Sequence, residues 1–180
     1  MNREKELFIE EENVVAGIFG AFLFSLAGGI LWFVLYQFGY LAGVSGLIGA
    51  LAAIKGYSLF AKKESIKGIV ISLVLATIVI VAAWYLCLAK DVFEAYKEWF
   101  NNGDVDFMPS LMQCITNAYV FLFEPEVGVS YLKDLGIGIL LCVIGSGGYV
   151  AKTIKRIKAE SSQEDELVSE EIVDEASFVE

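Results

Sequence analysis

The stretch VVAGIFGAFLFSLAGGILWFVLYQF, residues 14–38, decides the fold of this chain, because it contains no charged residue. A helix rises about 1.5 Å per residue, so about 20 apolar residues cross the roughly 30 Å hydrocarbon core of a bilayer. Three further apolar runs cover residues 40–60, 68–89 and 135–151, and the last is short enough that its span is expected to cover residues 132–151 to reach both interfaces. Backbone polar groups in hydrocarbon must bond within their own segment, which requires helices. The sequence predicts an all-α fold: a polytopic membrane helical bundle with four transmembrane helices.

The spans divide the chain into three parts. Residues 1–13 form an acidic segment, residues 14–152 the membrane domain, and residues 153–180 an acidic tail. From Glu160 onwards the tail carries nine acidic residues and no basic residue, so we expect it to be disordered or to serve as a docking peptide for a cytoplasmic partner. A net charge of −10 argues against nucleic acid as a partner, because its phosphates require a basic surface.

The basic residues near the span ends predict the orientation in the membrane. They gather between the second and third spans and again after the fourth, at Lys62, Lys63, Lys67, Lys152, Lys155, Arg156 and Lys158. Basic residues flanking spans favour the cytoplasm, so both termini should be cytoplasmic and the spans should cross the cytoplasmic membrane. Aromatic residues expected at the opposite interface agree: Trp32, Tyr36, Tyr40, Trp84, Tyr85 and Tyr131.

The connection over residues 90–131 is expected to form two amphipathic outer helices. The first covers residues 91–100 and is broken at Asn101, Asn102 and Gly103. Asp106 should cap the second, with Pro109 in its first turn, and this helix should end before Pro125. At about 14 residues it is too short for a span. It either caps the bundle on the outer leaflet or forms a re-entrant or lid helix over a substrate cavity.

Small residues recur every fourth position along the first two spans. They are Gly17, Ala21, Ser25 and Gly29 in the first, and Ala42, Gly46 and Ala50 in the second. Helices in membranes associate through close backbone approach, which small side chains permit. We therefore expect the first two spans to pack as a tight antiparallel hairpin through these residues. Association of two copies through a leftover small face is the alternative.

No catalytic, cofactor or metal site is predicted, and we expect the protein not to be an enzyme. Gly43-Val44-Ser45-Gly46 matches the motif of rhomboid proteases, but their serine needs a histidine base and this sequence contains no histidine. The cysteines show no C-x-x-C spacing. Lys55 is the one charged residue inside the four apolar runs. It either extends toward the cytoplasmic interface or provides a buried counter-charge for an anionic ligand.

The sequence resembles a group of small multi-pass bacterial membrane proteins of uncharacterised function in three segments: Glu12 to Ala21, Ile54-Lys55-Gly56-Tyr57 and Lys67-Gly68. The resemblance covers roughly Glu12 to Ala151 and implies a bacterial origin and a helical bundle. Some members carry a zinc-ribbon head, for which this sequence lacks the cysteine pairs before Val14. The resemblance implies no activity.

Two functions remain open at this point. The first is a structural or interaction module, or an accessory subunit, that contacts the bilayer and a membrane-protein partner or a second copy of itself. The second is a component of small-molecule transport, such as the substrate-binding membrane subunit of an importer. Those subunits usually cross six times, and the four apolar runs contain no carboxylate of the kind that coupled transport usually needs.

Overall fold

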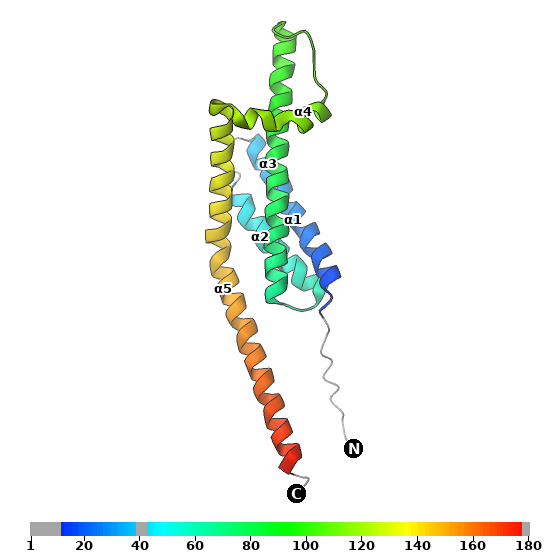
Figure 1. The fold of residues 1–180 in the computed structure, drawn as a ribbon, viewed down its shortest axis with the longest axis vertical. Coiled ribbons are helices and arrows are strands. Elements are labelled where there is room, and N and C mark those ends of the chain that lie inside the picture. The colour runs from blue at the N-terminus through cyan, green and yellow to red at the C-terminus, as the bar shows by residue number, and fades with distance from the viewer. Residues whose placement is uncertain (1–11, 39–42, 178–180) are drawn as a thin grey trace.

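The computed structural model describes residues 12–38 and 43–177, and the chain is helical throughout its main elements (Figure 1). These elements are α1 (Val14–Gln37), α2 (Val44–Ala61), α3 (Ile66–Asn102), α4 (Leu111–Asn117), the 3-10 helix η1 (Ala118–Phe123) and α5 (Pro125–Ser177). Within the described ranges, α1, α2, α3 and the part of α5 up to Gln163 are long and apolar enough to cross a membrane. The predicted all-α bundle with four spans is therefore confirmed.

Helices α1 and α2 make the closest helix–helix contact of the bundle, where glycines face each other. A Cβ on Gly56 would lie 2.6 Å from the carbonyl oxygen of Gly20, and one on Gly49 would lie 3.1 Å from the Cα of Gly28. The first separation is too short for a methyl group and the second would force the neighbouring backbone to shift, so the two helices approach this closely because these residues lack side chains. Asn13 caps α1, since its side chain accepts a hydrogen bond from the Ala16 amide.

Helix α3 is longer than predicted. The separate helix expected over residues 91–100 is wrong, because α3 runs without interruption from Ile66 to Asn102, through both the third predicted span and this segment. Nothing between residues 89 and 91 breaks a helix, and Lys90 forms an ion pair with Glu94 one turn later, 2.7 Å apart. The helix ends at Gly103, whose φ of 81° is readily adopted only by glycine.

The second outer helix begins later than predicted. Ser110, and not Asp106, caps α4: its hydroxyl accepts a hydrogen bond from the Gln113 amide while the Gln113 side chain accepts one from the Ser110 amide. This reciprocal capping box satisfies two helix-end donors at once, so Ser110 starts the helix and Pro109 precedes it. The predicted end before Pro125 is confirmed, since η1 finishes at Phe123.

Helix α5 extends far beyond the expected span of residues 132–151. It starts at Pro125 and continues to Ser177, so the acidic tail, expected to be disordered, is helical up to that residue. Residues 152–177 contain neither glycine nor proline, and nothing in the sequence interrupts the backbone hydrogen bonds after the span. The remaining expectations for residues 1–11 and 178–180 lie outside the described residues.

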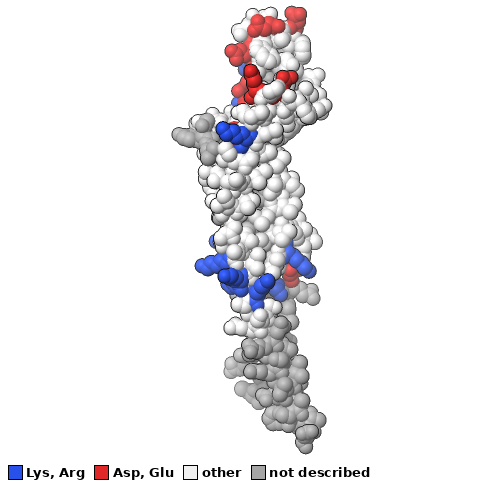
Figure 2. Space-filling model, turned by 60° about the vertical axis from the view of Figure 1, so that its left-hand side comes forward, with Lys and Arg blue, Asp and Glu red and all other residues white. Residues whose placement is uncertain are grey.

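Charges separate along the bundle and define its two ends. Figure 2 shows Lys and Arg gathered mainly on one side of a wide uncharged band, with Asp and Glu gathered on the other. We call the part formed by residues 90–134 the acidic end and the part formed by residues 62–67 and 152–158 the basic end. Helix α4 and η1 lie across the acidic end (Figure 1). Two hydrophobic clusters meet there, one built around Trp32 and Trp84 and one around Leu88 and Cys114.

Candidate functional site

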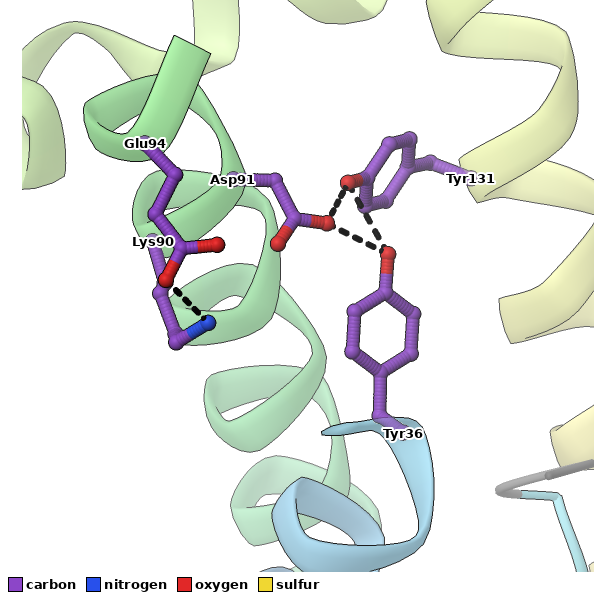
Figure 3. Close-up of polar contacts among 5 residues, drawn as sticks. All are labelled: Tyr36, Lys90, Asp91, Glu94 and Tyr131. Carbon is purple, nitrogen blue, oxygen red and sulfur yellow. Dashed lines mark hydrogen bonds and ion pairs between the residues drawn. The ribbon is translucent and has the colours of Figure 1, made fainter. Parts of the chain in front are cut away.

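A carboxylate and two phenols meet at the acidic end. Tyr36 near the end of α1 and Tyr131 in α5 both donate hydrogen bonds to the same oxygen, Oδ2, of Asp91 in α3, with a distance of 2.7 Å for Tyr36 (Figure 3). The two hydroxyl oxygens lie 2.9 Å apart. Hydrogen bonds to a charged acceptor are stronger than those between neutral groups. The cluster therefore connects three helices through one carboxylate.

The surrounding helices hold these side chains in place. The indole N–H of Trp84 donates to the Tyr131 carbonyl at 2.9 Å, which fixes the start of α5 against α3. The Tyr85 hydroxyl donates to the Ile115 carbonyl at 2.8 Å and fixes α4 against the same helix. Ala118, at the start of η1, is fully buried in the same region. The walls of the site are thus anchored by both polar and apolar contacts.

Beside the cluster lies a cavity of about 250 Å³, which we call the aromatic pocket. Its lining residues are Leu88, Asp91, Val92, Ala95, Tyr96, Trp99, Phe121, Val127 and Tyr131. The Tyr96 ring packs edge-on against Trp99, with centroids 5.2 Å apart, and against Phe121, with centroids 6.5 Å apart. The pocket thus combines four aromatic rings with one carboxylate.

The electrostatics of the pocket favour a cation. In Figure 3 the second oxygen of Asp91 is turned away from both phenols, and within the described ranges Asp91 forms no ion pair. The neighbouring cation, Lys90, is engaged with Glu94. Residues 90–134 contain eight acidic residues and three lysines, so the surrounding field is also negative. A carboxylate among the negative faces of aromatic rings is the arrangement that attracts organic cations.

The described small residues that were predicted to form the contact between the first two spans are buried. They do not all face the same helix, however, because some of them contact other helices of the bundle. Of the first set, Gly17 faces Tyr57 and Ala61 of α2, whereas Gly29 faces Val79 of α3. Ala21 and Ser25, between them on α1, are also buried. Of the second set, Ala42 lies outside the described residues, and Gly46 and Ala50 are buried in α2.

Gly46 does not face α1. A Cβ there would lie 3.4 Å from the Gly138 carbonyl oxygen of α5 and 3.4 Å from a methyl group of Ile80 in α3. The face of α2 that carries Gly46 therefore packs against the third and fourth spans, while Gly49 and Gly56 face α1.

Lys55 lies at the other end of the molecule, in a second cavity of about 450 Å³ between α2 and α5. We call this cavity the basic pocket; its lining residues are Lys55, Ser58, Leu59, Glu64, Tyr149, Lys152, Thr153 and Arg156. The fold thus brings Lys55 together with two basic residues of α5 that are distant in the sequence.

Sequence reasoning missed Asp91 and the aromatic residues around it as one site. It treated Tyr36 and Tyr131 as interface anchors and the aromatic residues after residue 90 as one face of an amphipathic helix. The one available signal was an acidic residue directly after a span, followed at helical spacing by Tyr96 and Trp99. That signal does not indicate that α1, η1 and α5 complete the site.

No protein-family profile, no curated protein and no solved structure matches this chain. By the length and hydropathy of its helices, the chain is a multi-pass membrane protein in contact with the lipid bilayer.

Proposed function

We propose that this protein is a non-enzymatic membrane interaction module, of the kind that serves as an accessory subunit, and that its aromatic pocket binds an organic cation. The observation that carries the proposal is the Asp91 carboxylate, which has no cationic partner within the described ranges and lines a pocket walled by Tyr96, Trp99 and Phe121. A quaternary ammonium group fits this chemistry, because it contacts ring faces and a carboxylate without needing a hydrogen-bond acceptor.

The proposed orientation places the pocket outside the cytoplasm. The basic end carries most of the lysines and arginines that flank the spans, and such residues favour the cytoplasmic side. Both termini would then be cytoplasmic and the aromatic pocket would open to the outer side of a bacterial inner membrane. The bacterial membrane in this proposal is what the resemblance to small bacterial multi-pass proteins implies.

The partner of such a module within the membrane would contact α5. Only 17% of the residues in the apolar window of this helix are buried, the lowest share among the four candidate spans. Its exposed apolar residues include Leu140, Val143 and Ile144. An accessory subunit needs a face of this kind. The transport alternative would need further crossings, and the remaining apolar helix, Leu111–Phe123, is too short to provide one.

The proposal is tested by comparing choline with its neutral isostere, dimethylbutanol, in which carbon replaces the charged nitrogen. The full chain is purified in mild detergent, and binding is followed by tryptophan fluorescence, since Trp99 lies in the wall of the pocket. We expect choline to bind and the isostere to bind about 5- to 30-fold more weakly, because the neutral compound loses the attraction of the carboxylate and rings, worth roughly 1–2 kcal/mol.

Two matched variants locate the binding. Asp91→Asn removes the charge in the pocket, and Glu94→Gln removes the same charge one helical turn away, outside the lining. Choline affinity should fall in the first variant and stay unchanged in the second. Equal binding of choline and its isostere, an equal loss in both variants, or no binding by the wild-type protein would each overturn the proposed pocket function.

A further inference from the structure

The basic pocket contains more positive than negative charge. Lys55, Lys152 and Arg156 line it, against one carboxylate, Glu64, which is paired with Arg156. The ammonium groups of Lys55 and Lys152 form no ion pair or hydrogen bond with a described residue, and the contact of Lys55 with Ser58 is made by its carbonyl oxygen, which accepts from the Ser58 hydroxyl. The two ammonium groups therefore supply charge that no described side chain of the protein neutralises.

Hydroxyl groups accompany these charges. Ser58, Tyr149 and Thr153 line the same cavity. The Thr153 side chain is only 6% exposed, and its hydroxyl makes no hydrogen bond to any residue that the structure describes. Ammonium groups next to hydroxyl donors match the needs of a phosphate, whose oxygens accept several hydrogen bonds at once.

The position of the cavity along the bundle indicates that a phosphate bound there would belong to a lipid headgroup. Helix α2 ends at Ala61 and α3 starts at Ile66, so the cavity, which extends from Lys55 to Arg156, lies where the apolar band meets the charged basic end. It lies between two membrane-spanning helices, and Leu59 in its wall is 69% exposed. An acyl chain can cover such a surface while the phosphate stays among the lysines.

We propose that the basic pocket between α2 and α5 binds the phosphate of an anionic phospholipid, with Lys55 and Lys152 as its main cationic contacts and Thr153 as a hydroxyl donor. The site goes beyond the proposed cation binding at the acidic end and does not depend on it. Basic cavities between transmembrane helices near the headgroup layer are suited to this role.

The test measures lipid retention by the full chain in mild detergent, using native mass spectrometry. Phosphatidylglycerol and phosphatidylcholine with identical acyl chains are added in equal amounts. We expect the wild-type protein to retain phosphatidylglycerol preferentially. The double variant Lys55→Gln/Lys152→Gln should lower this preference about 25-fold, since each basic side chain near the headgroups strengthens the binding of an anionic lipid roughly fivefold.

The matched control is Lys63→Gln/Lys158→Gln, which removes the same charge from the basic end without touching the lining of the cavity. Its preference should stay close to that of the wild type. Lys152→Arg, which keeps the charge, should retain the lipid. Melting temperatures of all variants in phosphatidylcholine alone identify any variant that has lost its fold, and such a variant is replaced by the corresponding single substitution.

Three outcomes would overturn the proposal. The first is a wild-type protein without a preference between the two lipids. The second is an equal loss in the double variant and its control, which would indicate diffuse attraction by the whole basic end. In a separate arm inorganic phosphate competes with the lipid; if phosphate alone binds at millimolar concentration with the same dependence on Lys55, the cavity is a site for a soluble anion instead.

Discussion

The Tyr131 phenol of α5 donates a hydrogen bond to the Asp91 carboxylate of α3, at the level where the Tyr36 phenol of α1 reaches the same oxygen. Three of the four membrane-spanning helices are thus joined at one acceptor. Helices surrounded by lipid gain little from hydrophobic burial against each other, so polar contacts of this kind contribute to their association.

We expect Asp91→Ala to lower the free energy of unfolding by about 2–4 kcal/mol, because two half-buried phenols lose their charged acceptor. Tyr131→Phe should cost about 1.5–3 kcal/mol, since it removes one hydrogen bond to a charged group. Tyr119→Phe is the control: this phenol is 52% exposed and has no hydrogen bond to a described residue. Unfolding in detergent, followed by tryptophan fluorescence, measures the free energy of unfolding of all three variants. If Asp91→Ala has the same free energy of unfolding as the wild-type protein, the cluster contributes nothing to stability.

The contact between α1 and α2 gives a second prediction. A Cβ at Gly28 would collide with the Cα of Gly49, so Gly28→Ala should separate the two helices and lower the free energy of unfolding by about 1–3 kcal/mol. Gly147→Ala is the matched control, because nothing lies within 4 Å of a Cβ at that position in α5. Equal melting temperatures for the two variants would mean that the helices do not meet at Gly28.

The division of the small residues between two neighbours follows from helix geometry. Residues four apart are rotated by about 40° around the helix axis, so twelve residues, from Gly17 to Gly29, turn through about 120°. Small residues at every fourth position therefore wind slowly around the helix. Those at one end of α1 face α2 and those at the other end face α3, as the surroundings of Gly17 and Gly29 show. The spacing predicts burial but does not identify which helix is contacted.

The spans were predictable because membrane crossing depends on the local sum of hydropathy. The continuity of α3 through Lys90 could not be predicted in the same way, because a charged residue at the end of an apolar run marks the edge of the hydrocarbon layer without ending the helix. The aromatic pocket was the least predictable feature. Asp91, Phe121 and Tyr131 come from three elements, and their proximity depends on how α5 and η1 pack against α3.

The contact between Glu12 and the start of α3 predicts a pH dependence. Burial alone would raise the pKa of the Glu12 carboxyl, but hydrogen bonds from Ser65 and Tyr57, with nearby Lys67 and Lys63, hold this pKa below its ordinary value of 4.5. A lowered folded-state pKa means that the charged carboxylate stabilises the fold above about pH 4.5 and that this stabilisation is lost as the pH falls through the folded value.

Glu12→Gln should therefore lower the melting temperature at pH 7, and the difference from wild type should shrink as the pH falls below about 4.5. Glu98→Gln, which changes an exposed carboxylate at the acidic end, serves as the control and should show no such convergence. A difference between Glu12→Gln and wild type that stays constant with pH would show that the carboxylate charge is not what stabilises this contact.

The last prediction concerns α4, which either caps the bundle or moves as a lid. Cys114 is only 3% exposed between α4 and α3, and burial raises the pKa of its thiol, so little reactive thiolate is accessible. Met112 on the same helix is 70% exposed. In intact cells, a membrane-impermeant maleimide should label Met112→Cys rapidly and Cys114 slowly, with each position read by peptide mass spectrometry.

Lys158→Cys, at the basic end, should react only after the membrane is permeabilised, because the proposed orientation places it in the cytoplasm. Labelling of Lys158→Cys and protection of Met112→Cys in intact cells would reverse that orientation. If Cys114 instead reacts as fast as Met112→Cys in folded protein, α4 opens readily and moves as a lid. Slow labelling of Cys114 that accelerates only on unfolding is the result expected of a fixed cap, because the contacts with Leu88 and Ala89 must then break before the reagent can enter.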